Sequence, residues 1–101
     1  MSFWVYMLRC VDDSFYVGHT DNLETRVAHH QTGDYPSYAL KRRPVVLVYS
    51  QEFTSREEAL SAEKQIKSWS RAKKQALIDG DWRRIQHLAW GVKNPLPERL
   101  R

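Results

Sequence analysis

Residues 55–74 read SREEALSAEKQIKSWSRAKK, a stretch with the spacing of an amphipathic helix. Its apolar face is formed by Ala59, Ala62, Ile66 and Trp69. Glu63 falls inside the same arc, where an apolar side chain would be expected. A carboxylate among apolar neighbours must be paired, protonated or bound to a cation. Glu63 is therefore the first candidate site residue.

Basic residues recur at helical spacing beside that carboxylate and suggest a polyanionic partner. Residues 1–36 hold two basic and five acidic residues, whereas residues 37–101 hold 14 basic and seven acidic ones. The net charge of the whole chain is +4. The asymmetry favours nucleic acid, although an ordinary solvated basic surface would have the same composition. The candidate nucleic-acid-binding residues are Lys41, Arg42, Arg43, Lys64, Lys67, Arg71, Lys73 and Lys74.

A chain of 101 residues is of the size of one domain. We expect that domain to cover residues 1–91 and residues 92–101, with two prolines, to form a flexible tail. The single cysteine, Cys10, excludes an internal disulfide and a cysteine-rich zinc site. No apolar run is long enough for a membrane span or a signal peptide, so we expect a cytoplasmic protein without a membrane partner.

The order of predicted elements is β-β-α-β-α-α. Residues 3–10 are apolar on both faces, as in a central strand, and form a hairpin with residues 15–19. A helix begins at Asp21, a third strand covers residues 45–49, and the long helix has a capping box at Thr54 or Ser55. A new turn is possible near Ser70, and a last helix follows Gly80. The fold class is α+β, a small three-stranded antiparallel sheet flanked by helices.

Several kinds of site are excluded, since the chain has no glycine-rich phosphate loop and no Cys/His metal spacing. Five residues remain as candidates for phosphodiester chemistry: Tyr6, Tyr16, Arg26, His30 and Glu63. A carboxylate can hold a divalent metal, an arginine stabilises phosphoryl charge, and a tyrosine can orient or deprotonate water. The alternatives are strand packing for the tyrosines, a surface charge for Arg26 and a helix-end cation for His30.

These residues occur in an order that resembles the GIY-YIG nuclease superfamily. Trp4-Val5-Tyr6 is followed by Tyr16-Val17-Gly18, then by Arg26, His30 and Glu63. The sequence is most similar to the small stand-alone UPF0213 proteins, over residues 3–80. The resemblance implies cleavage of DNA with Mg²⁺ or Mn²⁺. It also implies a general base at Tyr6, a second tyrosine at Tyr16, phosphate binding by Arg26, a helper histidine at His30 and a metal ligand at Glu63.

Three features depart from the pattern of that superfamily. The first motif has Trp4 and Val5 in place of glycine and isoleucine, and the region of an expected asparagine reads Lys74-Gln75. No DNA-targeting domain accompanies the core, so a protein partner could supply targeting. The first hypothesis is a structure-selective DNA endonuclease of repair or processing, acting on branched, nicked or single-stranded DNA. The alternatives are a non-hydrolysing nucleic-acid-binding module of the same fold and an interaction domain in which Glu63 is merely salt-bridged.

The nuclease hypothesis makes a geometric prediction about the hairpin. A two-residue loop at Asp12-Asp13 would pair Tyr6 with His19 and place Tyr16 on the opposite face. Tyr6 and Tyr16 can share a site only if the loop is longer or a bulge lies near residues 10–15 or at Gly18.

Overall fold

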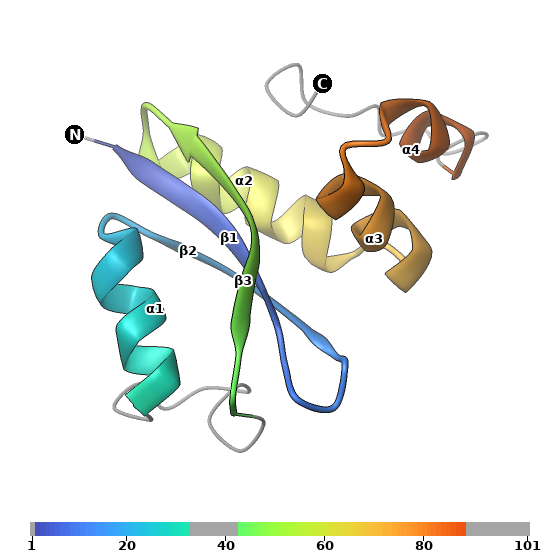
Figure 1. Ribbon diagram of the computed structural model, residues 1–101. Helices are drawn as coiled ribbons and strands as arrows, with labels where there is room; N and C mark the ends of the chain where they lie inside the picture. Colours follow the sequence, from blue (N-terminus) through green and yellow to red (C-terminus); the bar gives the residue numbers. More distant parts are fainter. Residues whose placement is uncertain (1, 33–42, 89–101) are drawn as a thin grey trace.

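The structure, a computed structural model, describes residues 2–32 and 43–88, which form three strands and four helices (Figure 1). The expected α+β class is confirmed, with a separate helix after the long one. The predicted tail at 92–101 and the predicted cations Lys41 and Arg42 lie outside the described residues. The elements in chain order are β1 (Phe3–Arg9), β2 (Phe15–Thr20), α1 (Leu23–Thr32), β3 (Val46–Phe53), α2 (Arg56–Lys67), α3 (Arg71–Asp79) and α4 (Trp82–Leu88).

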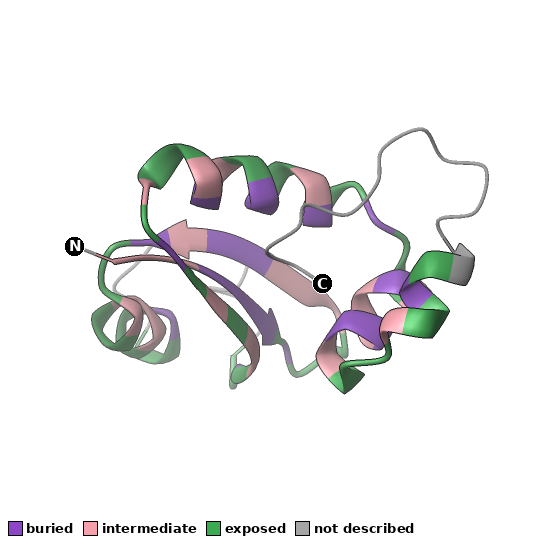
Figure 2. Ribbon diagram, turned by 90° about the horizontal axis from the view of Figure 1, so that it is seen from above, coloured by how far each residue is buried: buried purple, intermediate pink, exposed green. Residues whose placement is uncertain are grey.

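The sheet is antiparallel with strand order β2-β1-β3, so β1 is central as its apolar faces predicted. Residues 5–8 of β1 have no exposed surface. Helices α1 and α2 cover opposite faces of the sheet, and the buried residues of α2 lie on the side that faces the strands (Figure 2). Two apolar clusters result, one between the sheet and α2 and a smaller one beneath α1.

The hairpin between β1 and β2 has the longer loop that the nuclease hypothesis requires. Cys10 N–H donates to the Ser14 carbonyl and Asp13 N–H donates to the Cys10 carbonyl, both at 2.9 Å. Asp13 has a left-handed φ of 70°, so a type I turn is followed by one left-handed residue. This three-residue loop sets the register Leu8↔Tyr16 and Tyr6↔Gly18. Tyr6 and Tyr16 therefore share one face of the sheet.

The third strand is an edge strand and is longer than the predicted 45–49. Its register with β1 shifts between Met7 and Leu8, which marks a bulge at that point. Val46 and Leu47 near its start are 51% and 39% exposed. The apolar run at 45–49 thus covers only the first part of β3, and the more polar residues up to Phe53 complete the strand.

The stretch 55–74 is two helices rather than one. Ser55 caps α2, its hydroxyl accepting from Glu58 N–H, which confirms one of the two predicted capping boxes. The helix ends at Lys67, and Ser70 caps α3 by accepting from Lys73 N–H. One long helix would place the basic residues Lys64, Lys67, Arg71 and Lys74 in a single row. They lie instead on two helices, because the chain turns between α2 and α3.

The caps of the other helices are local side chains. The start of α1 was also misplaced: Asn22, not Asp21, is the cap, and its side-chain oxygen accepts from Thr25 N–H. Gly80, at φ 70°, ends α3 as expected, and the Asp81 carboxylate caps α4. Within residues 2–32 and 43–88, no helix combines the length and apolarity that crossing a bilayer requires.

Candidate active site

A cleft of about 220 Å³ opens along the free edge of β2. Because β2 is an edge strand, the cleft receives side chains from both faces of the sheet and from α1 and α2. It brings together four of the five predicted residues, with His30 directly behind one of them. The lining residues are Tyr6, Tyr16, Gly18, His19, Thr20, Asp21, Arg26, Arg56 and Glu63.

The two tyrosines and His30 form an aromatic cluster at this edge. The ring centroids of Tyr6 and Tyr16 are 6.2 Å apart, and those of Tyr16 and His30 are 4.9 Å apart. Tyr6 reaches the cleft from the central strand by passing over Gly18, its partner on β2. A Cβ at Gly18 would lie 2.6 Å from the Tyr6 hydroxyl oxygen. Tyr6 thus packs directly against the backbone of Gly18, and the β1–β2 register continues without a bulge there.

Gly18→Ala is expected to destabilise the fold and disturb the cleft. The new methyl would also lie 2.8 Å from Cζ of Tyr6, and that ring is fully buried. Overpacking of this kind costs about 1–3 kcal/mol in the free energy of unfolding, which urea denaturation measures. The double variant with Tyr6→Phe loses the closest atom, so it should be less destabilised than the two single variants together. Wild-type stability in Gly18→Ala would place the Tyr6 ring elsewhere.

His30 is buried beside Tyr6 rather than exposed as a helix-end cation. It has no exposed surface, and its Nε2 lies 3.0 Å from the Tyr6 hydroxyl. Burial lowers the pKa of His30 below its usual 6.5, and the positive charges of Arg26 and His29 lower it further. With Nε2 unprotonated, the Tyr6 hydroxyl donates its hydrogen bond to the ring. In this arrangement Nε2 of His30 can accept the phenolic proton of Tyr6.

This lowered pKa predicts that the protein loses stability on acidification. Above about pH 6.5 the His30 ring is neutral in both folded and unfolded chains. As the pH falls below 6.5, the unfolded chain binds a proton that the folded chain resists, so the free energy of unfolding falls until the lower folded pKa is passed. Denaturation from pH 8 to 5 measures this. His30→Gln should flatten the acid decline, whereas His29→Gln, which changes an exposed neighbour, should keep most of it.

Glu63 projects from α2 to the opposite wall of the cleft and is held by two basic side chains. Glu63 is only 9% exposed, and its neighbours Ala62 and Ile66 on α2 are buried as well. One carboxylate oxygen lies 2.9 Å from Nδ1 of His19, and the other lies 3.6 Å from Nζ of Lys67. The expected pairing of this carboxylate is therefore present. No group of three His, Cys, Asp or Glu side chains able to hold a metal occurs among the described residues.

The remaining polar wall comes from α1 and the start of α2. Arg26 is half-buried and lines the cleft together with Asp21. Asp21 pairs with Arg56 at 3.5 Å between charged atoms, and the Arg56 guanidinium lies 4.9 Å above the Phe3 ring. The cleft is therefore lined by two guanidinium groups, those of Arg26 and Arg56, and by two carboxylates, those of Asp21 and Glu63.

Sequence reasoning missed His19 and Arg56 as members of the site. The signal for His19 lay in the hairpin register: a three-residue loop turns Tyr16 toward the Tyr6 face and His19 toward α2. No comparable signal marks Arg56, because its position depends on how α2 packs against the β2 edge. Arg56 brings a guanidinium group to the cleft, and His19 brings a ring nitrogen that lies in hydrogen-bond distance of Glu63.

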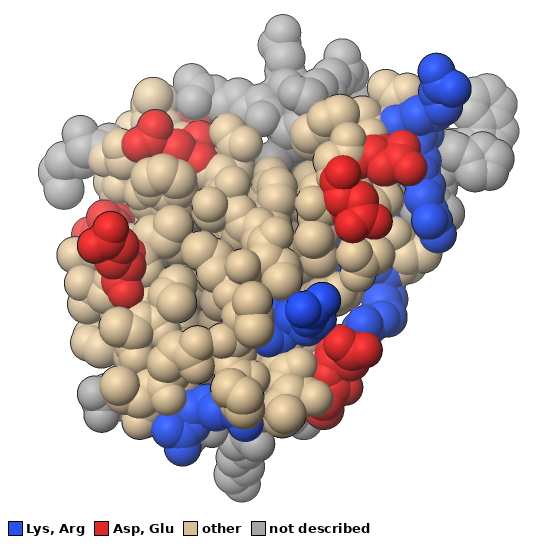
Figure 3. All heavy atoms as spheres, in the orientation of Figure 1, with Lys and Arg blue, Asp and Glu red and all other residues tan. Residues whose placement is uncertain are grey.

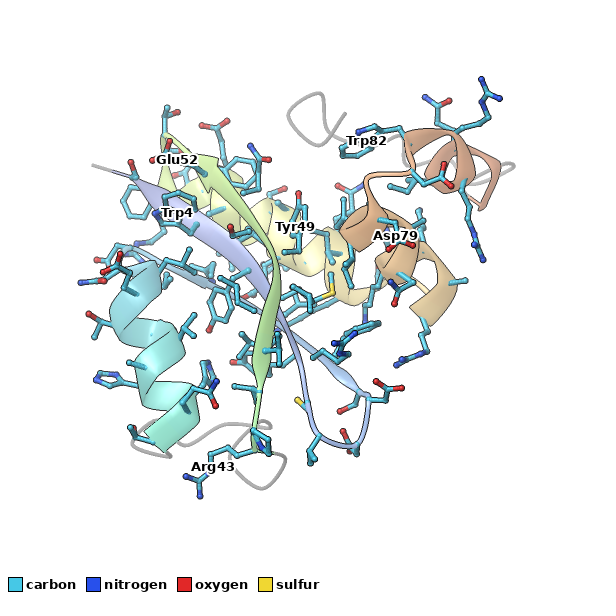
Figure 4. All side chains as sticks on the ribbon, viewed as in Figure 1. Trp4, Arg43, Tyr49, Glu52, Asp79 and Trp82 are labelled. Atoms are coloured by element: carbon cyan, nitrogen blue, oxygen red, sulfur yellow. The ribbon has the colours of Figure 1, made fainter. Side chains whose placement is uncertain are left out.

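The predicted cationic residues have different positions in the structure. We expected Lys73 to be a surface cation. It is instead buried, with its ammonium 4.3 Å from the Trp69 ring centroid. Arg71 bonds to the Asp13 carbonyl and stacks on Phe15. Arg43 donates to the Gln31 carbonyl, at the opposite end of β3 from Glu52 (Figure 4). Lys64 and Lys67 are exposed on α2.

This chain is similar to a known domain family and to proteins from several organisms. The family described as the GIY-YIG catalytic domain matches residues 2–76. A UPF0213 protein of Staphylococcus haemolyticus is 45% identical over 76 residues, which cover 75% of this chain and 93% of that protein. A UPF0213 protein of Natronomonas pharaonis is 45% identical over 75 residues, covering 74% of this chain and 88% of that protein.

Two solved structures have the same fold. The solution NMR structure of a UPF0213 protein from Bacillus halodurans has a TM-score of 0.54 at 37% identity, covering 80% of this chain and 86% of that one. The solution NMR structure of a protein from E. faecalis has a TM-score of 0.53 at 31% identity, covering 97% and 95%.

Proposed function

The chain belongs to the GIY-YIG family, among the small UPF0213 proteins, and from this we propose that it is a metal-dependent endonuclease that hydrolyses DNA phosphodiester bonds. The fold is of the nuclease type. One observation carries the proposal: Tyr6, Tyr16, Arg26 and Glu63, far apart in sequence, line a single cleft, and Nε2 of His30 lies 3.0 Å from the Tyr6 hydroxyl behind it.

The donor set fits a divalent cation that keeps most of its water ligands. Mg²⁺ is typically held by one or two carboxylates plus substrate phosphate oxygens rather than by an all-protein cage. Glu63 supplies one such carboxylate, and His19 orients it through the 2.9 Å hydrogen bond, as outer partners of metal ligands commonly do. When bound, Mg²⁺ or Mn²⁺ would polarise the phosphate and stabilise the leaving oxygen.

The remaining residues supply positioning and proton transfer. Arg26 binds the non-bridging phosphate oxygens and stabilises the charge that develops on them. Tyr6 accepts the proton of the attacking water as its own phenolic proton passes to Nε2 of neutral His30. Tyr16 lies at the mouth beside the His30 ring and orients the attacking or leaving oxygen. Each of these groups is fixed by packing rather than by a mobile loop.

DNA is the proposed substrate, selected by shape rather than by base sequence, in repair or processing. The cations around the cleft, Arg26, Arg56 and Lys67, contact phosphates and carry no base preference. On the face shown in Figure 3, the described residues place Lys and Arg side chains beside Asp and Glu side chains, so these residues form no continuous basic patch there. We also propose a cytoplasmic location and a protein partner that supplies targeting.

A non-hydrolysing DNA-binding module is the second candidate. The contacts of Glu63 favour it, since both carboxylate oxygens already have a basic neighbour, at 2.9 and 3.6 Å. In addition, half-buried Lys74 occupies the region where an asparagine was expected. Such a module would hold phosphates at the cleft without activating water.

Labelled DNAs incubated with Mg²⁺ or Mn²⁺ distinguish the two functions. The panel contains single-stranded, duplex, nicked, flapped and four-way-junction DNA, with EDTA as the metal-free control. We expect cutting of at least one structure, abolished by EDTA. Binding of these DNAs without cutting would favour the second candidate, and neither binding nor cutting would contradict both.

A further inference from the structure

A second cleft lies along β2 directly beside the first. It has the same volume, about 220 Å³, and is lined by Phe15, Tyr16, Val17, Lys67 and Lys74. Tyr16 forms part of the wall of both clefts. Lys67 joins them as well, because it lines the second cleft while its Nζ lies 3.6 Å from Glu63 of the first. The two clefts are thus consecutive along one edge of the molecule.

The chemistry of the second cleft suits an anion with an apolar portion. Phe15, Tyr16 and Val17 give it a largely apolar wall, and two lysines give it positive charge. Lys74 is half-buried, and no acidic side chain among residues 2–32 and 43–88 forms an ion pair with it. Burial lowers the pKa of Lys74, because the charged ammonium loses part of its hydration. A bound anion would remove that cost.

Arg71 shows the contrast between a structural cation and a free one on the same helix. Its guanidinium is already used, by the Asp13 carboxylate at 3.8 Å and by the Phe15 ring at 4.5 Å. Arg71 therefore holds the hairpin loop and one face of Phe15 in place. Lys74, one turn further along α3, has no such contact among the described residues and is directed to the cleft.

We propose that the second cleft binds the nucleotide next to the scissile phosphate on the same strand, with Lys74 on its phosphate and the Phe15–Val17 wall against its sugar and base. This inference rests on the proposed function, since the scissile phosphate is taken to occupy the first cleft. An unpaired strand can place sugar and base against an apolar wall, whereas a paired strand presents mainly its phosphates. The substrate class that follows is DNA with an unpaired segment at the site of cutting.

The test compares charge removal inside and outside the second cleft. Binding is measured in the Glu63→Gln background, so that nothing is cut, with a labelled oligothymidylate and with a blunt duplex over a range of NaCl. Lys74→Met should weaken binding of the single strand about tenfold and reduce its salt slope by about one ion. The duplex should lose about twofold or less. Arg84→Met, an exposed cation of α4 that lines neither cleft, should change neither.

A charge-conserving variant and a measurement of stability separate loss of binding from loss of the fold. Lys74→Arg keeps the charge and should restore most of the affinity, and thermal unfolding shows whether Lys74→Met has kept its fold. Equal effects of Lys74→Met on single strand and duplex, or an effect no larger than that of Arg84→Met, overturn the inference. If Glu63-dependent cutting by the wild type accompanies that result, the proposed function stands alone. If the wild type binds no DNA, both fail.

Discussion

Glu63→Gln is expected to reduce metal-dependent cleavage about a thousandfold while leaving DNA binding unchanged or slightly tighter. The amide keeps the size of the side chain and its place between Ala62 and Ile66. It removes the one charge that would hold the metal, whose stabilisation of the transition state is several kcal/mol, and each 1.4 kcal/mol is about tenfold in rate. DNA affinity should not fall, because the substitution removes a negative charge that would repel the DNA phosphates. Single-turnover cleavage and fluorescence anisotropy measure the two effects.

The matched control for this change is Glu57→Gln on the same helix. Glu57 is exposed in the first turn of α2 and lines neither cleft, so the same charge is removed without touching the site. Its cleavage rate should equal that of the wild type. Equal rates for Glu63→Gln and the wild type would exclude Glu63 as the metal ligand.

Tyr6→Phe is expected to lower the cleavage rate by about 10²–10⁴, the usual contribution of a general base, with little change in DNA affinity. The hydroxyl is the only group lost, and it is the group that joins the cleft to Nε2 of His30 at 3.0 Å. Loss of this hydrogen bond also lowers the free energy of unfolding by about 0.5–1.5 kcal/mol. Rate, DNA affinity and urea denaturation together separate the catalytic loss from the structural one.

Tyr49→Phe is the control for removing a buried tyrosine hydroxyl. Tyr49 lies on β3, away from both clefts, and its hydroxyl has no hydrogen-bond partner among the described residues (Figure 4). Burial raises the pKa of Tyr49 to about 12, so its hydroxyl stays protonated. The variant should cut DNA at the wild-type rate with equal or higher stability. A Tyr6→Phe protein that cuts equally well would contradict the role of Tyr6.

The sequence predicted those features that local patterns determine. The apolar faces of residues 3–10 identified the central strand, and helical spacing identified the buried face of α2 around Glu63. The requirement that Tyr6 and Tyr16 share a face predicted a longer hairpin loop, which the left-handed Asp13 provides. These are effects of strand alternation and helical period, which do not depend on distant contacts.

Other features depend on tertiary packing and could not be read from one stretch. The break between α2 and α3 separates Lys64 and Lys67 from Arg71 and Lys74, and it leaves Lys73 packed against the Trp69 ring. The pairing of His19 with Glu63 joins residues 44 positions apart. These two residues meet only because α2 packs on the β2 edge. Each belongs to a different sequence motif, and neither motif alone predicts the contact.

Addition of metal to a preformed complex tests the central claim most directly. The wild type and Glu63→Gln are each saturated with a DNA that the wild type cuts, in the absence of divalent metal, and Mg²⁺ is then added. The account predicts that bound DNA is cut in a single turnover by the wild type and stays intact in the Glu63→Gln complex. Cutting of both complexes at the same rate, or of neither, would contradict hydrolysis at this cleft.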